Sequence, residues 1–234
     1  MYHYGGKAEV QAWISVSELS AYSSFPKGHL LAVLTAYFDG CGKSHDPSTP
    51  FLTLVGYAAE AIVWPGFEAA WAKALADHKV DCLHFKDPAI RENPLLVGVL
   101  LETIECGGRF GMHSVSCSVN LAEHRKVSTE RPGRVCAEGC INTLLSEAPS
   151  MSCFFDRNEE FFEEVKNPWE NESERWPQLA NITELGLVRS RDFPGVQAAD
   201  WLGWYINRAL TRRDYDVDLA LLENRANHRA IIKP

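Results

Sequence analysis

The sequence lacks a surplus of basic residues. Its 234 residues include 23 lysines and arginines against 31 aspartates and glutamates, so the formal net charge is −8. Proteins that grip nucleic acid over a broad surface usually carry a basic excess. The charge therefore excludes a broad basic face, and any contact with nucleic acid must come from a local patch. The acidic surplus also agrees with a cluster of carboxylates at one site.

The cysteine patterns of disulfide-rich and zinc-ribbon proteins are missing as well. The seven cysteines are odd in number, and none forms a CxxC pair. We therefore predict reduced, mostly buried thiols in a cytoplasmic protein. Cys136 and Cys140 have the i,i+4 spacing that presents two sulfurs on one helix face, as a zinc site needs. Without a clear second pair, a zinc protein is the weakest of the alternatives.

Long apolar runs are also absent from the sequence. No stretch approaches the ~20 apolar residues of a membrane-spanning helix, and the N-terminus lacks the pattern of a secretory signal. We therefore expect no membrane segment. With 46% hydrophobic and 11% aromatic residues, the chain can bury a sizeable core. Residues 1–30 are weakly patterned, so we predict an N-terminal extension there and one domain over residues 31–234.

Strand-like and helix-like segments alternate through this domain. The predicted strands are residues 31–40, 51–60, 82–86, 109–121, 151–156 and 182–190, and the predicted helices are 64–79, 94–105, 132–148, 157–167 and 193–208. The first two strands are expected to form an antiparallel hairpin with a long loop. Residues 169–178 are expected to form a polar loop. The alternation predicts an α/β domain with a mixed central sheet.

Three aspartates stand out in this pattern. Asp39 and Asp156 each end a predicted strand after an aromatic residue, in YFD and FFD, although Asp also favours ordinary turns. Asp200 lies inside the apolar helical stretch FPGVQAADWLGWYINR, where an unpaired buried carboxylate is costly. Asp200 is explained by a metal, by an exposed helix face, or by an arginine partner such as Arg189 or Arg191.

A parallel pairing of the strands that end in Asp39 and Asp156 would bring both to one sheet edge, and the late helix would add Asp200. Three converging carboxylates repel one another unless a cation neutralises them. Hard oxygen ligands suit Mg²⁺ or Mn²⁺, and a pair of such ions supports phosphodiester hydrolysis. The sequence therefore predicts a metal site formed by these three aspartates. Gln197, one turn before Asp200, would support it.

The motifs AYFDGCG, FFDRN and GVQAADWLGW resemble those of the domain-of-unknown-function 3800 (DUF3800) family, which has a ribonuclease-H-like fold. The resemblance extends over most of the chain, and its third motif is the most specific. It implies a ribonuclease-H-like sheet with Asp39 and Asp156 as catalytic strand residues and Asp200 on the closing helix. The family's first motif usually reads Asp-Glu-Ser-Gly, whereas Gly40 takes the glutamate's place here.

The resemblance also implies roles for residues near the aspartates. The family often carries a histidine in the segment matching CLHFKD, which makes His84 a candidate, and Lys86 beside it would contact a phosphate. Glu159 or Glu160 would substitute for the missing glutamate. All four are also explained as structural or surface residues. The leading hypothesis is a metal-dependent nuclease acting on DNA or RNA. The alternative is a catalytically inactive ribonuclease-H-like binding or regulatory module.

Overall fold

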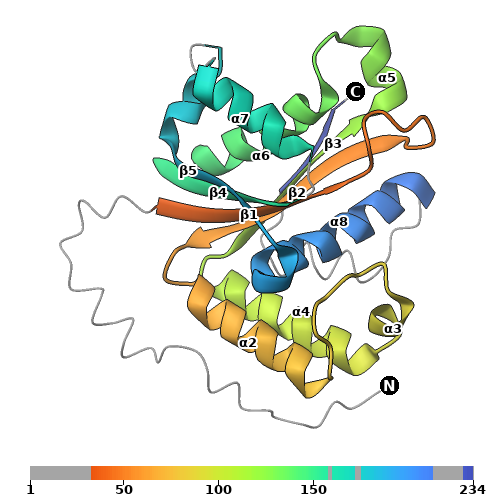
Figure 1. Ribbon diagram of the computed structural model, residues 1–234, viewed down its shortest axis with the longest axis vertical. Helices are drawn as coiled ribbons and strands as arrows, with labels where there is room; N and C mark the ends of the chain where they lie inside the picture. Colours follow the sequence, from red (N-terminus) through yellow and green to blue (C-terminus); the bar gives the residue numbers. More distant parts are fainter. Residues whose placement is uncertain (1–32, 158–159, 172–174, 213–228, 234) are drawn as a thin grey trace, which may run out of the picture.

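A mixed six-stranded sheet forms the centre of the molecule (Figure 1). The computed structural model describes residues 33–157, 160–171, 175–212 and 229–233. The strands are β1 (Val33–Cys41), β2 (Phe51–Glu60), β3 (His113–Asn120), β4 (Ser150–Asp156), β5 (Ile182–Val188) and β6 (Arg229–Lys233). Their order across the sheet is β5-β4-β1-β2-β3-β6. β2 is antiparallel to β1 and β3, whereas β4 is parallel to β1 and β5, and β6 is parallel to β3.

Helices cover both faces of this sheet (Figure 1). One face carries α2 (Trp64–Asp77), α4 (Pro94–Arg109) and α8 (Pro194–Arg212), and the other carries α6 (Pro132–Leu145) and α7 (Phe161–Asn171). The shorter helices are α3 (Pro88–Arg91), α5 (Leu121–Val127), η1 (Pro177–Asn181) and η2 (Ser190–Asp192). The chain therefore has a ribonuclease-H-like α/β fold, which confirms the prediction of a mixed central sheet between helices.

The two central parallel strands, β1 and β4, divide their aromatic side chains between the two cores. Side chains alternate between the faces of a strand, so Tyr37 and Phe38 point in opposite directions. Tyr37 stacks on Phe154 of β4 with ring centroids 5.6 Å apart, and Phe38 stacks on Phe155 at 5.0 Å. These two cross-strand pairs hold β1 and β4 in register. The register in turn determines which residue of β1 and which residue of β4 lie side by side where the two strands end.

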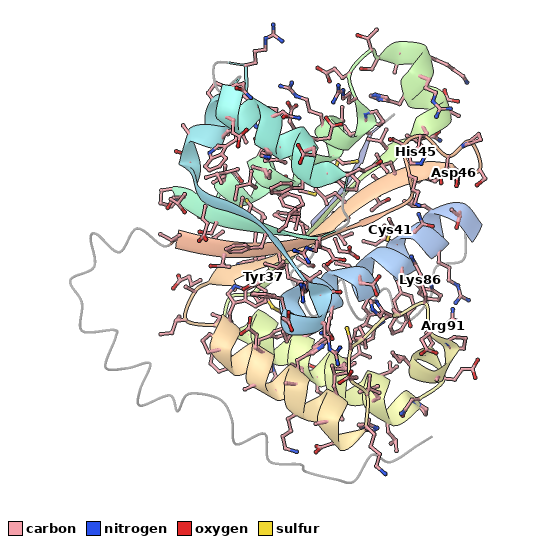
Figure 2. All side chains as sticks on the ribbon, in the orientation of Figure 1. Tyr37, Cys41, His45, Asp46, Lys86 and Arg91 are labelled. Atoms are coloured by element: carbon pink, nitrogen blue, oxygen red, sulfur yellow. The ribbon has the colours of Figure 1, made fainter. Side chains whose placement is uncertain are left out.

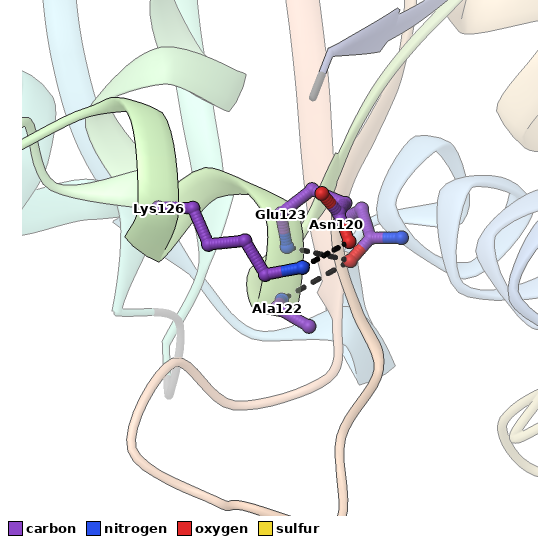
Figure 3. Close-up of polar contacts among 4 residues, drawn as sticks. All are labelled: Asn120, Ala122, Glu123 and Lys126. Atoms are coloured by element: carbon purple, nitrogen blue, oxygen red, sulfur yellow. Dashed lines mark hydrogen bonds and ion pairs between the residues drawn. The ribbon is translucent and has the colours of Figure 1, made fainter.

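α5 begins directly at the end of β3, and its first turn is capped by Asn120 (Figure 3). The Asn120 side chain accepts hydrogen bonds from the backbone N–H groups of Ala122 at 3.1 Å and Glu123 at 3.2 Å. These groups have no partner within the helix, which is why asparagine is favoured at this position. Lys126 forms an ion pair with Glu123 at 2.7 Å one turn later. The side chains therefore explain why the strand stops and a helix starts here.

Two of the predicted elements are wrong. Residues 82–86 do not form a strand, because side chains of α8, rather than a neighbouring strand, accept the N–H groups of Leu83 and Phe85. Residues 169–178 are not a plain polar loop. α7 extends to Asn171, and Trp176 is buried with its indole N–H donating to Asn142 at 2.9 Å. The predicted extension over residues 1–30 lies outside the described part of the chain.

All seven cysteines lie in the described part, and none forms a disulfide. Four are buried: Cys117, Cys136, Cys140 and Cys153. The thiols of Cys136 and Cys140 donate to the backbone carbonyls of Leu52 and Leu54 in β2. The two sulfurs thus face the sheet from α6. No helix among the described residues is long and apolar enough to cross a membrane.

Candidate active site

Asp39 and Asp156 end two neighbouring strands at the same edge of the sheet. β1 and β4 are parallel, and their paired residues stop one position before the two aspartates. Because side chains alternate, Asp39 lies on the same face as Tyr37, and Asp156 lies on the same face as Phe154. Both aromatic rings belong to the core beneath α8. The parallel pairing that would bring Asp39 and Asp156 to one sheet edge is thus present, and it places both aspartates on the face that α8 covers.

α8 approaches the sheet closely enough to bring Asp200 to this edge. Figure 2 shows Tyr37 and Cys41, in the two halves of β1, beside α8. A Cβ atom on Gly195 would lie 2.4 Å from Cδ2 of Tyr37, and a Cβ on Gly203 would lie 2.7 Å from the Sγ of Cys41. Such distances are too short for a real Cβ, so a larger residue at either position would force its neighbours to shift. The two glycines let the helix rest on β1, with Asp200 between them in the sequence.

The carboxylate of Asp200 is anchored to the segment that follows α2. Its Oδ2 accepts a hydrogen bond from the backbone N–H of Phe85 at 3.0 Å. Arg191, one of the two arginines considered as partners of Asp200, instead pairs with Asp81. Asp156 is held in a similar way, because its Oδ1 accepts from the backbone N–H of Ser190 at 3.1 Å. Backbone amides thus orient two of the three aspartates.

Gln197 connects the segments that supply those amides. Its side chain is 2% exposed. Its Oε1 accepts from the indole N–H of Trp71 at 3.1 Å and from the backbone N–H of Leu83 at 3.0 Å. Its Nε2 donates to the backbone carbonyl of Ser190 at 2.8 Å. Gln197 does not contact the carboxylates in these hydrogen bonds. It supports them indirectly, because its three partners fix the backbone at Leu83 and at Ser190, next to the amides that hold Asp200 and Asp156.

The electrostatic environment favours the neutral form of Asp200. Burial raises the pKa of the Asp200 carboxyl above its ordinary value, and the nearby charge of Asp156 adds to this rise. The N–H of Phe85 and the positive charges of His84 and Lys86 lower the pKa and oppose the shift. The structure thus places His84 and Lys86 close enough to Asp200 to influence its protonation. A positively charged ligand at this position would favour the ionised form.

One cavity of about 1200 Å³ joins five of the predicted residues, and Gln197 lies outside its wall. Its wall includes all three aspartates together with His84 and Lys86. Residues of the loop between β1 and β2 also line this cavity. The cavity therefore brings the predicted strand ends, the late helix and the segment 82–86 into one site.

Of the two glutamates considered as substitutes for the missing one, Glu160 lines this cavity and Glu159 lies outside the described residues. The Glu160 carboxylate accepts from the backbone N–H of Ser44 at 3.1 Å and interacts with the Ser44 hydroxyl at 3.2 Å. It therefore ties the β1–β2 loop to the start of α7. This contact accounts for Glu160 structurally, and it also places a further carboxylate in the cavity wall.

The three aspartates of the cavity suit a hard divalent cation, since they supply carboxylate oxygens. The three aspartate side chains are farther apart than the ligands of a preformed metal site. Within the described ranges, no group of three or more His, Cys, Asp or Glu side chains lies close enough together to hold a metal ion. Asp156 does lie close enough to Asp200 for its charge to raise the pKa of the Asp200 carboxyl. By chemistry the aspartates fit Mg²⁺ or Mn²⁺, but their side chains do not form a closed three-ligand cluster.

Some residues of the cavity were not found by sequence reasoning. Trp204 and Arg208 line it from the second half of α8. Their i,i+4 and i,i+8 spacing from Asp200 places them on the same helix face, so helical periodicity could have identified them. The backbone N–H groups of Phe85 and Ser190 have no sequence signal, because any residue except proline supplies one.

Comparisons with known proteins identified no relative of this chain. No family model matches the chain, and no match was found among curated proteins or among solved structures.

Proposed function

We propose that the protein is a metal-dependent phosphodiesterase of the nuclease type. One observation carries the proposal: Asp39, Asp156 and Asp200 come from two adjacent parallel strands and one covering helix, and they line the same cavity. An enzyme of this type needs carboxylates that face a cavity large enough for substrate. The cavity also contains two basic side chains, His84 and Lys86, that suit a phosphate group.

In this proposal Asp39, Asp156 and Asp200 hold Mg²⁺ or Mn²⁺. When bound, the cation neutralises the carboxylates and stabilises the charge that develops on the reacting phosphate. Lys86 binds a phosphate oxygen of the substrate. The N–H groups of Phe85 and Ser190 keep the Asp200 and Asp156 carboxylates in place. Preorganised groups of this kind cost no reorganisation during the reaction.

His84 lies between the two backbone amides that α8 binds, Leu83 N–H and Phe85 N–H. Its imidazole lines the cavity and lies close enough to Asp200 to affect the pKa of that carboxyl. A histidine held in this way can donate a proton to a leaving oxygen or accept one from water. We assign it that role in the proposed reaction.

Thermal melting with and without millimolar Mn²⁺ tests the proposal. Wild type is expected to gain stability from Mn²⁺, and Asp200→Asn is expected to lose that gain. Asp77→Asn is the matched control, because Asp77 is an exposed helical aspartate paired with Lys73 on α2. Hydrolysis of a labelled oligonucleotide should follow the same order. Equal Mn²⁺ responses in wild type and Asp200→Asn would contradict the proposal.

A second candidate function is a ribonuclease-H-like binding or regulatory module without catalysis. Two observations favour it: Gly40 replaces the family glutamate, and the Asp156 and Asp200 carboxylates already have backbone partners that explain their presence structurally. This candidate predicts ligand binding in the cavity with no Mn²⁺-dependent hydrolysis. The melting and hydrolysis measurements together separate the two functions.

A further inference from the structure

The cavity extends along α8 well past the aspartates. Asp200, Trp204, Arg208 and Thr211 all line it. Their spacings of four, eight and eleven residues place them on one face of the helix. At a rise of 1.5 Å per residue, this stripe is about 16 Å long. Bases stacked in one strand are about 3.4 Å apart, so the stripe exceeds the length of a single nucleotide.

Trp204 is the central residue of this stripe, and two guanidinium groups lie over it. Arg91 lies 5.1 Å and Arg208 lies 5.2 Å from the centre of the indole. Phe85 and Tyr205 contact the indole in edge-on geometry, at 5.3 Å and 4.9 Å between ring centroids. The ring is therefore held rigidly by aromatic neighbours, and its cationic partners sit on flexible side chains.

The surroundings of Trp204 are cationic although the chain as a whole is acidic. Figure 2 shows Lys86 and Arg91 beside the second half of α8. Lys86 and Arg208 both line the cavity, and neither forms an ion pair with another residue that the structure describes. The buried Nε of Arg208 has no hydrogen-bond partner in the described part of the protein. Such an atom is costly unless a ligand completes its bonding.

These observations lead us to propose that α8 is the binding track of a single-stranded nucleic acid. One base stacks on Trp204, and the neighbouring phosphates bind Arg208 and Lys86. The strand then continues along the helix toward Asp200. The guanidinium groups that cover the indole move from the ring to the phosphates when the base arrives. This inference rests on the proposed function, because it supplies the substrate class of the same cavity.

The chemistry favours a single strand over a duplex. Stacking on an aromatic side chain requires an unpaired base with an open face, and every base has one. Proteins bind a duplex through its phosphates, over a broad basic surface. A chain with a net charge of −8 does not offer such a surface. A single aromatic ring with Arg91, Arg208 and Lys86 beside it matches the single strand.

Fluorescence anisotropy with a labelled twelve-nucleotide oligonucleotide tests the track. The titration is done in EDTA, so that binding does not depend on a metal ion or lead to hydrolysis. Wild type is expected to bind the single strand, and Trp204→Leu is expected to bind it roughly 5- to 150-fold more weakly, the range found for loss of one stacked base. Trp204→Phe keeps an aromatic ring and should restore most of the affinity.

Matched controls separate stacking from general effects on the fold. Trp169 is a partly buried tryptophan on α7, outside the cavity, so Trp169→Leu should bind as wild type does. Arg208→Gln should weaken binding and flatten its dependence on salt, whereas Arg109→Gln, at an exposed position on α4, should do neither. Because Arg208 lies on a helix surface facing the cavity, its variant tests the track even if Trp204→Leu does not fold.

The outcomes distinguish this inference from the proposed function. If Mn²⁺ stabilises wild type but the single strand does not bind, the track is overturned and the metal site stands. Equal binding by wild type, Trp204→Leu and Arg208→Gln would also overturn it, as would a preference for the matched duplex. Binding that depends on Trp204 and Arg208 without any Mn²⁺ response would support the track and favour the non-catalytic module.

Discussion

The Oδ2 of Asp200 lies 3.0 Å from the backbone nitrogen of Phe85, and this contact joins α8 to the segment that carries His84 and Lys86. Three residues earlier on the same helix, Gln197 accepts the N–H of Leu83. Two side chains of α8 thus accept the N–H groups of two residues in one segment, Leu83 and Phe85. The contact explains both why this segment is not a strand and how it reaches the cavity.

Stability without metal should depend on the ionisation of Asp200. Burial raises its pKa in the folded state, so between the ordinary pKa and the raised pKa the folded protein binds more protons than the unfolded chain. The stability contributed by the neutral carboxyl is therefore present at acidic pH and is lost as the pH rises through the raised pKa. Asp200→Asn keeps an oxygen for the Phe85 N–H and cannot ionise.

We expect metal-free Asp200→Asn to melt at a higher temperature than wild type at neutral pH, with the difference disappearing below the ordinary aspartate pKa of about 4. Melting curves at a series of pH values in EDTA check this, with Asp77→Asn as the control. A variant that is less stable than wild type at every pH would show that the ionised carboxylate is needed for the fold itself.

Loss of the Gln197 side chain should destabilise the protein strongly. Gln197→Leu would leave the buried N–H groups of Trp71 and Leu83 without acceptors, at a cost of about 1–3 kcal/mol for each. We expect a loss of about 2–6 kcal/mol in the free energy of unfolding, measured by urea denaturation. Gln197→Glu keeps an acceptor for both groups and should lose less. Equal losses for the two variants would argue against this network.

Gln197→Glu also offers a test of positioning. If Gln197 orders the backbone of residues 83–85 and Ser190, the variant should change Mn²⁺ affinity or the pH profile of hydrolysis. The comparison is made under conditions where the variant is fully folded. A purely structural glutamine would lower the melting temperature and leave both readouts unchanged.

The close packing of α8 on β1 predicts opposite effects for two glycine substitutions. In Gly203→Ala the new Cβ would lie 2.7 Å from the Sγ of Cys41 and 3.2 Å from Cγ2 of Val55. We expect a loss of about 1–3 kcal/mol from overpacking. Gly98→Ala, on α4, meets nothing within 4 Å and should gain about 0.5–1 kcal/mol from helix propensity. Urea denaturation of both variants measures the difference, and a stable Gly203→Ala would show that the helix can move away from β1.

The thiols should fall into two classes of reactivity. Cys140 and Cys153 are buried, and burial raises the pKa of each thiol well above its ordinary value. Cys82 and Cys106 are partly exposed, although burial also raises the pKa of both. A disulfide reagent at pH 8 should therefore label the partly exposed thiols slowly, and the buried ones only after denaturation. Rapid labelling of Cys153 in the native protein would contradict the buried core.

Most of the fold was predictable because its signals are local. The apolar run ending in Asp39, the run ending in Asp156 and the amphipathic helices each carry their periodicity within a few residues. The segment 82–86 was misread for the same reason. Its composition suits a strand, and only the distant side chains of Gln197 and Asp200 decide that its amides bind elsewhere.

The sequence by itself determined the alternation of strands and helices, the aspartates at two strand ends, and the unusual carboxylate of Asp200 in an apolar helix. These depend on residue type and spacing along the chain. Tertiary structure alone decided that β4 pairs beside β1, that Gln197 supports the site from behind, and that Trp204 and Arg208 extend the cavity. Such relations join residues far apart in the chain, because pairing and packing depend on which surfaces meet after folding.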